Sequence, residues 1–276
     1  MEAIQSAEGK ISIMATAKCH YFETCGGCSA QHIDYNLQVE KKKQELAHAT
    51  KNSEIKVFTG EEYSYRNRMD FIFHEEGLGL REKGKWWKII DIKKCPIANE
   101  TVNILLREVR EYFSFVDAFD VKKNSGTFRY AVIRAPRKKS SISFVLNADA
   151  TRIKEAMEQI KDFAEKTTAE NVLVTYVPKM TDVSTSSEYV VVKGTDMLEE
   201  EFLGNVFQFP VQGFFQTNSL EAEKMQGYVQ SILQEYKTKN AHLLDLYGGV
   251  GTFGVCNAEK FKTVTIVESV PSSTDA

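Results

Sequence analysis

Four of the five cysteines in the chain form a pattern that suits a metal site. Cys19, Cys25 and Cys28 follow a C-x5-C-x2-C spacing, and Cys95 comes much later, in KKCPI. Four thiolates in a cytosolic protein indicate a metal site more often than disulfides, the plainest alternative being unrelated buried thiols. Zinc and an iron–sulfur cluster both accept four cysteines. A triplet with one distant cysteine favours the cluster over zinc, so we predict a 4Fe–4S cluster.

A glycine-rich loop near the end of the chain could bind a nucleoside cofactor. Residues 245–254 read DLYGGVGTFG and contain a G-x-G-x-x-G pattern that begins Gly249-x-Gly251. Glu268 stands at the end of the next predicted strand, where a carboxylate can accept from both hydroxyls of a ribose. Asp245 suits a ligand with a positive ammonium and sulfonium and would repel a pyrophosphate. The loop therefore favours S-adenosylmethionine over a nicotinamide or flavin; a plain glycine turn is the alternative without a ligand.

The elements that must position these residues follow from hydrophobic periodicity. Alternation of apolar residues predicts strands, and a spacing of three to four predicts helices. The predicted strands before residue 200 are 69–73, 78–80, 86–92, 128–135, 142–148, 171–177 and 189–194, and the predicted helices are 35–51, 98–114 and 151–166. This mixture of sheet and helix indicates an α+β domain.

After residue 205 the pattern changes to that of a βαβ unit. A helix is predicted over 215–236, beginning with FQTN, after an aromatic strand end. A buried strand is predicted over 242–247, followed by the glycine loop, a short helix and a strand over 263–268. The chain is therefore expected to be an α/β protein whose last part begins a Rossmann-like fold.

Composition is that of a globular protein, with 42% hydrophobic and 26% charged residues and a net charge of −3. No run reaches the roughly 18 apolar residues of a membrane helix, and the polar N-terminus does not resemble a secretory signal, so we expect a cytoplasmic protein. A polyanion could still bind a local basic face. Two basic groups are candidates: Lys83, Lys85, Lys88, Lys93 and Lys94 around Trp86 and Trp87, and Arg134, Arg137, Lys138 and Lys139.

Five motifs in a fixed order give the chain a family resemblance. CGGCSAQH, YRNRMDF, KKCP, FFQTN and LLDLYGGVGTFG together resemble the RNA uridine-C5 methyltransferases, which comprise iron–sulfur rRNA enzymes and archaeal tRNA enzymes. The resemblance runs from about 19 to 270. It implies a flexible leader at 1–18, an iron–sulfur and RNA-recognition domain at 19–204, and a partial class I S-adenosylmethionine-dependent methyltransferase domain at 205–276. The expected partner is RNA, either rRNA or tRNA.

The resemblance also implies roles for single residues. Gln216 matches a glutamine that contacts the methionine part of the cofactor. Tyr247 and Thr252 match loop positions that line the cofactor, and Glu268 matches the ribose-binding acid. The Arg66–Asn67 pair matches a family motif for which we assign no role.

The chemistry implied by the resemblance needs a cysteine that attacks C6 of uracil and a glutamate that helps to remove the C5 proton. Both belong after the ribose-binding acid, and the chain ends eight residues after Glu268. Cys256 is expected to be a core thiol, so no catalytic residue is assigned. We expect the chain to be the front part of an enzyme: a gene fragment, a truncated reading frame, or one half of a split protein whose second polypeptide supplies the missing C-terminal region. The alternatives are a non-catalytic iron–sulfur RNA-binding protein and a dinucleotide oxidoreductase; Asp245 and FFQTN disfavour the last.

Overall fold

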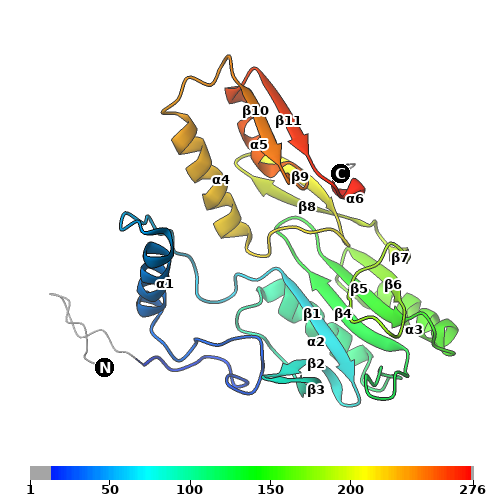
Figure 1. The fold of residues 1–276 in the computed structure, drawn as a ribbon. Coiled ribbons are helices and arrows are strands. Elements are labelled where there is room, and N and C mark those ends of the chain that lie inside the picture. Colours follow the sequence, from blue (N-terminus) through cyan, green and yellow to red (C-terminus); the bar gives the residue numbers. More distant parts are fainter. Residues whose placement is uncertain (1–13, 275–276) are drawn as a thin grey trace.

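The computed structural model describes residues 14–274, so most of the expected leader lies outside the described residues. A large mixed sheet with two helices on one face forms the body of the protein, and a smaller α/β part lies at its end, coloured yellow to red in Figure 1. The α/β class expected from the sequence is thus seen in both parts.

The large sheet has seven strands in the order β3-β2-β1-β4-β5-β6-β7. Its neighbours are antiparallel except for β5 and β6, which are parallel and joined through α3. The elements of this part are α1 (Tyr35–Thr50), β1 (Arg68–His74), β2 (Gly77–Glu82), β3 (Lys85–Asp91), α2 (Glu100–Tyr112), β4 (Phe128–Arg134), β5 (Ser141–Asn147), α3 (Ile153–Lys166), β6 (Asn171–Val177) and β7 (Tyr189–Lys193). Each was predicted within a few residues.

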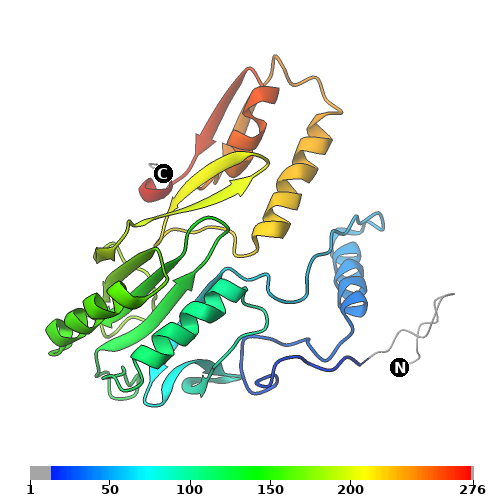
Figure 2. The same ribbon diagram turned by 180° about the vertical axis from the view of Figure 1, so that it is seen from behind.

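Helices α2 and α3 cover the same face of this sheet (Figure 2). The α2 helix begins after Asn99, whose side chain accepts from the Val102 amide and so satisfies a free helix donor. Leu105 and Leu106 of α2 are fully buried, as are Phe73 of β1 and Phe144 of β5. The apolar stripe predicted for this helix therefore forms the main core.

The last part of the chain contains β8 (Met197–Phe202), β9 (Asn205–Pro210), α4 (Ser219–Leu233), β10 (His242–Leu246), α5 (Thr252–Asn257), a 3-10 turn (Ala258–Lys260), β11 (Thr263–Val267) and α6 (Pro271–Thr274). Strands β8 and β9 form an antiparallel hairpin that the sequence analysis missed, and the expected boundary at 204–205 lies in its turn. The α4 helix begins after Asn218, which caps it, so FQTN is a loop before the helix, and the prediction that it forms the first turn was wrong.

Strands β10 and β11 form a separate parallel pair. We expected 242–247 to be a buried strand, and this was wrong. Leu244 and Leu246 are 53% and 55% exposed, and Ile266 of β11 is 38% exposed. The physical reason is that each strand of the pair has a single strand neighbour among the described residues, and α5 packs on the pair from one side. Across residues 14–274 no helix combines the length and apolar character needed to cross a membrane.

Candidate functional site

The four predicted ligand cysteines lie around one cavity. Cys19, Cys25 and Cys28 come from the loop that precedes α1, and Cys95 comes from the loop between β3 and α2. All four line a cavity of about 530 Å³. The fold therefore brings the distant cysteine to the triplet, as the spacing predicted.

Backbone amides point toward these thiols. The Gly27 amide donates to Cys25 Sγ at 3.4 Å. Burial raises the pKa of the Cys95 thiol, although the amides of Ala98 and Ile97 donate to its sulfur and act in the opposite direction. Hydrogen bonds from amides to sulfur, in a site removed from water, are features that tune iron–sulfur clusters.

The position of Cys95 is fixed by a residue that the sequence analysis missed. Asn103 on α2 is 7% exposed, and its Oδ1 accepts from the Cys95 amide at 2.8 Å. Its Nδ2 donates to the carbonyls of Cys95 at 3.0 Å and Ala98 at 3.1 Å. A polar residue beside the apolar stripe of a predicted helix was the signal that could have identified it.

Within the described range, no group of three or more histidine, cysteine, aspartate or glutamate side chains is arranged so that it could hold a metal ion. The cysteines border a shared cavity and have no disulfide between them. Their role as ligands remains a prediction.

The glycine loop is tied to the two acidic residues that the sequence singled out. Asp245 lies in β10, and its Oδ2 accepts from the Gly254 amide in α5 at 2.9 Å. Glu268 follows β11, and its Oε2 accepts from the Gly249 amide at 2.9 Å. Because β10 and β11 are parallel, both acids lie toward the carboxyl ends of the two strands, Asp245 as the penultimate residue of β10 and Glu268 just after β11.

Glu268 is held in its ionised form by backbone donors. Its Oε1 accepts from the amides of Val270 at 2.9 Å and Ser269 at 2.6 Å. The amides of Val270, Gly249 and Ser269 lower the pKa of this carboxyl. The carboxylate can therefore accept further hydrogen bonds from hydroxyl groups at neutral pH.

The glycines of the loop have two different roles. A Cβ on Gly251 or Gly254 would lie 2.6 or 2.8 Å from side-chain atoms of Ile266, so these glycines let the loop and α5 pack closely on β11. Gly249 has a φ of 58° and nothing within 4 Å of its ideal Cβ. Of these three glycines, only Gly249 leaves the backbone open to a ligand.

The three remaining predicted cofactor residues, Tyr247, Thr252 and Gln216, make none of the hydrogen bonds that join the glycine loop to Asp245 and Glu268. Tyr247 is 92% exposed at a φ of 59°, a conformation that non-glycine residues seldom adopt. Thr252 Oγ1 accepts from Gln226 Nε2 at 3.1 Å. Gln216 lies in the loop between β9 and α4, with an exposed side chain. None of the three lines the cysteine cavity or the cavities of about 730 and 860 Å³ elsewhere in residues 14–274.

The Arg66–Asn67 pair, left without a role by sequence, holds the FFQTN loop. The Asn67 amide donates to the Thr217 carbonyl at 2.9 Å, and Asn67 Nδ2 donates to the Gln216 carbonyl at 3.1 Å. Arg66 forms an antiparallel bridge with Asn218. The large sheet therefore positions the segment that carries Gln216.

This arrangement agrees with a comparison against known families. The model of the tRNA (Uracil-5-)-methyltransferase family matches residues 34–276. The chain belongs to this family. The resemblance stated from the five motifs is confirmed, and the match covers the large sheet as well as the glycine loop.

Relatives in the family come from archaea and bacteria. A tRNA (uracil(54)-C(5))-methyltransferase of Pyrococcus horikoshii is 31% identical over 252 residues, which cover 90% of this chain and 59% of the relative. A protein of Leptospira interrogans named only as an RNA methyltransferase is 31% identical over 266 residues, covering 92% of this chain and 58% of the relative. The chain thus spans about three-fifths of the length of the curated relatives it matches.

A solved family member shares the fold. The crystal structure of the Pyrococcus abyssi tRNA (uracil-54, C5)-methyltransferase in complex with S-adenosyl-L-homocysteine superimposes with a TM-score of 0.69 and 26% identity. The superposition covers 84% of this chain and 55% of that structure. The Rossmann-like α/β class predicted for the present chain is therefore confirmed.

The fifth cysteine is a core residue. Cys256 is 7% exposed and packs in a small core with Phe202 and Phe207. Burial raises the pKa of its thiol, and its Sγ lies 3.8 Å from the Phe202 carbonyl oxygen. A buried thiol with a raised pKa is a poor nucleophile, which agrees with the expected structural role.

The second basic group does not form a free basic patch: Arg134 is buried, so its predicted part in RNA binding was wrong, and that of the other three members stays a prediction. Arg134 is 2% exposed, and its Nη1 donates to the carbonyls of Val211 and Gly213, each at 2.7 Å. The other three members form ion pairs with acidic residues of the last part of the chain: Arg137 with Glu223, Lys138 with Glu201 and Lys139 with Glu199. The group instead joins the large sheet to the β8–β9 hairpin and α4.

Proposed function

We propose that the chain binds S-adenosylmethionine and RNA as part of an RNA (uracil-C5)-methyltransferase. The observation that carries this proposal is the Gly249 amide bonded to the Glu268 carboxylate at the carboxyl ends of β10 and β11. Ligands in α/β sheets bind at this edge. The family match over residues 34–276 supports the same reaction class.

The residues at this edge suit the cofactor. Glu268 would accept from the ribose hydroxyls, and the open backbone at Gly249 would allow the nucleoside to approach. Asp245 would place negative charge near the ammonium and sulfonium groups. When bound, the cofactor supplies an electrophilic methyl group. The crystal structure of the Pyrococcus abyssi relative, which contains S-adenosyl-L-homocysteine, supports this ligand class.

Three further cofactor contacts follow from family membership. Gln216 would contact the methionine part, while Tyr247 and Thr252 would line the loop side. The exposed Tyr247 side chain and its unusual backbone conformation support a role in binding, because such strain concentrates at functional sites.

The cysteine cavity is proposed to hold a 4Fe–4S cluster. The support for this proposal is that four thiols line one cavity of about 530 Å³ and that two of them have amide donors. The cluster would fasten the loop before α1 to the loop before α2. Its role is therefore expected to be structural, comparable with a cross-link that closes a long loop.

The substrate is proposed to be a uridine in a folded RNA, with tRNA as the first candidate. The Pyrococcus relatives are named as tRNA (uracil-54) enzymes, whereas several bacterial relatives are named only as RNA methyltransferases. The part at 19–204 would supply RNA recognition and the part at 205–276 cofactor binding. A target base must leave its stack to be methylated.

Two measurements test the proposal. Calorimetric titration with S-adenosylhomocysteine should show binding that Glu268→Ala abolishes and Glu259→Ala, an exposed acid on the 3-10 turn, leaves unchanged. Labelled methyl transfer to a uridine-containing tRNA transcript should require a polypeptide with the cysteine nucleophile that the family chemistry needs, because Cys256 is buried. Absence of cofactor binding with retained RNA binding would favour a non-catalytic RNA-binding protein. Turnover that Cys256→Ala abolishes would make Cys256 the nucleophile.

A further inference from the structure

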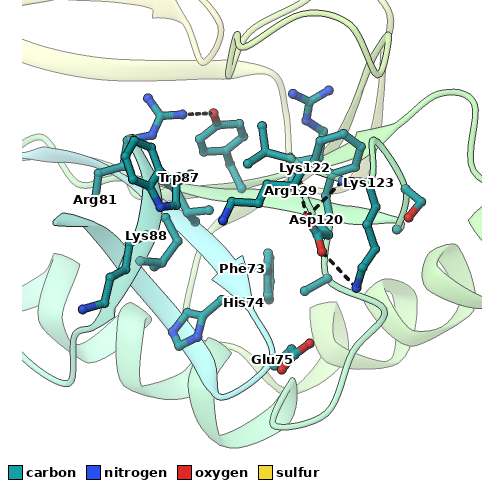
Figure 3. Close-up of a pocket in the computed structure, with 18 of the residues that line it drawn as sticks. Phe73, His74, Glu75, Arg81, Trp87, Lys88, Asp120, Lys122, Lys123 and Arg129 are labelled. Atoms are coloured by element: carbon teal, nitrogen blue, oxygen red, sulfur yellow. Dashed lines mark hydrogen bonds and ion pairs between the residues drawn. The ribbon is translucent and has the colours of Figure 1, made fainter. Parts of the chain in front are cut away.

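A second cavity lies on the side of the large sheet formed by β3. Its volume is about 730 Å³, within the range of sites for nucleotides and molecules of similar size. Trp86, Trp87 and Lys88 of β3 line one wall, and residues 117–123 of the loop between α2 and β4 line the other. Figure 3 shows Trp87 and Lys88 on one side, Lys122 and Lys123 on the other, and Phe73 and His74 between them.

The wall on β3 presents aromatic surface to solvent. Trp86 is 57% exposed and Trp87 is 44% exposed, and the two rings meet edge to face at 5.9 Å between centroids. These are the two tryptophans of the chain. Exposed tryptophans beside a cavity are unusual for a folding core and typical of binding sites for flat ligands.

The opposite wall is a preformed loop. The amides of Lys122 and Lys123 donate to Asp120 Oδ1 at 2.8 and 3.2 Å, and Asp120 and Ser125 form a bridge across the loop. This brings the Lys122 ammonium to 5.7 Å from the centroid of the Trp87 ring. The Trp87 ring and the Lys122 ammonium are thus already positioned before a ligand binds, which lowers the entropic cost of binding.

A buried arginine lines the same cavity. Arg129 is 4% exposed, stacks at 4.3 Å on the Phe119 ring and donates from Nη1 to the Pro178 carbonyl at 2.8 Å. Its Nε is buried and has no hydrogen-bond partner in the described part of the chain. The guanidinium therefore adds a fixed positive charge to this wall of the cavity.

Charge is divided between the ends of the cavity. Three of its carboxylates are already matched by cations, Asp120 by Lys123, Asp182 by Arg81 and Asp91 by Arg110. Lys122 has no carboxylate partner within residues 14–274. Glu75, Glu76 and Asp117 also line the cavity and have no cation partner in the same range, and Glu75 lies away from Trp87 in Figure 3. Lys88 pairs with Glu82 at 2.5 Å, but Glu82 is shared with Lys85, so one carboxylate there faces two cations. A ligand's phosphate is therefore expected at the end with Lys88 and Lys122.

We propose that this cavity binds an unpaired nucleotide of the RNA, separate from the uridine that is methylated. Its base stacks on Trp87, and Lys88 and Lys122 contact the adjoining phosphates. The choice of RNA as the ligand rests on the proposed function. The cavity lies on the β3 side, and the β10–β11 pair lies at the far end of the molecule (Figure 1), so this nucleotide anchors the RNA at a distance from the cofactor.

Tryptophan fluorescence tests the proposal, because Trp86→Phe leaves Trp87 as the only tryptophan. A short single-stranded ribo-oligonucleotide should quench Trp87. An abasic oligomer of equal length and polyglutamate should not, since neither can stack. Equal quenching by polyglutamate would overturn the proposal and indicate a general polyanion or protein surface. Binding of the oligonucleotide in a filter assay without quenching of Trp87 would also overturn it. So would a complete absence of oligonucleotide binding in the filter assay.

Variants make the test quantitative. Trp87→Ala should weaken binding of the oligonucleotide by about 5- to 100-fold, whereas Trp87→Tyr keeps a stacking ring and most of the affinity. Lys122→Ala should weaken it a few-fold, and Lys161→Ala, an exposed lysine on α3, should not. Equal affinities for all four would overturn the proposal. Binding of S-adenosylhomocysteine by the same samples reports separately on the proposed function, because the glycine loop lies far from Trp87.

Discussion

The side chain of Asn67 in the first part of the chain donates from Nδ2 to Ser219 Oγ at 2.9 Å, across 152 positions of sequence. Ser219 in turn donates to the carboxylate of Glu200, which is fully buried. Asn67 itself is 6% exposed. One buried amide therefore links the large sheet to the start of α4 and to the loop that carries Gln216.

Replacement of Asn67 by Ala should both destabilise the protein and weaken cofactor binding. The change removes the hydrogen bonds that the buried Ser219 hydroxyl and the Gln216 carbonyl accept from Asn67, which costs about 1–3 kcal/mol of unfolding free energy. It also releases the Gln216 loop, so affinity for S-adenosylhomocysteine should fall. Urea unfolding and calorimetric titration measure the two effects. Asn240→Ala, at an exposed position, is the control. If Asn67→Ala unfolds normally and binds normally, the amide does not position the loop.

Loss of a cavity cysteine should remove iron and lower stability together. Cys95→Ala in anaerobically prepared protein should lose most of its iron and its broad absorption, and its melting temperature should drop by several degrees, because a cross-link between distant loops is lost. Cys256→Ala should keep its iron, since that thiol lies in a separate core. Iron and sulfide analysis with thermal melting provides the readout. One zinc per chain and no iron would exclude the cluster.

The glycines of the loop should separate binding from stability. Gly254→Ala places a Cβ 2.8 Å from an Ile266 carbon and should destabilise the β10–α5–β11 unit by about 1–3 kcal/mol. Gly249→Ala meets no neighbour and carries only the roughly 1 kcal/mol strain of a positive φ, yet its methyl group would face the cofactor. We therefore expect Gly249→Ala to lose affinity for S-adenosylhomocysteine with a modest change in melting temperature. Unchanged affinity in Gly249→Ala would place the cofactor elsewhere.

Acid should weaken the protein partly through Asp70. Burial raises the pKa of this carboxyl, but the hydrogen bonds and charge of Arg68, with help from Ser184, outweigh it and leave the pKa below its usual value. A depressed folded pKa means that the stabilisation is present above the pKa of the unfolded chain, near 4, and is lost as the pH falls through the lower folded value. Asp70→Asn should thus cost about 2 kcal/mol at pH 7 and little near pH 2. Urea unfolding across this pH range, with Asp149→Asn as an exposed comparison, checks the sign. A pH-independent difference would show that the ion pair is not responsible.

Local pattern predicted the elements of the large sheet well, because alternation and helical spacing report directly on which face of a segment is buried. The same pattern gave wrong predictions where the burial of a strand depends on how many neighbouring strands and helices pack against it. Strand 242–247 reads as buried by its leucines, yet Leu244 and Leu246 are half exposed in a two-stranded pair. The β8–β9 hairpin was missed because the acidic run Glu199–Glu201 of β8 masks the alternation that marks a strand.

The sequence by itself determined the family, the α/β class, the cysteine set and the glycine loop, since each depends on residue type and short spacing. The tertiary structure decided three relationships between distant segments: Asn67 with the Gln216 loop, the basic residues 137–139 with the acids of β8, and Trp87 with Lys122 across the second cavity. Partners so far apart in the chain leave no periodic trace in it. Their contacts arise only when packing of the sheet fixes where each segment lies.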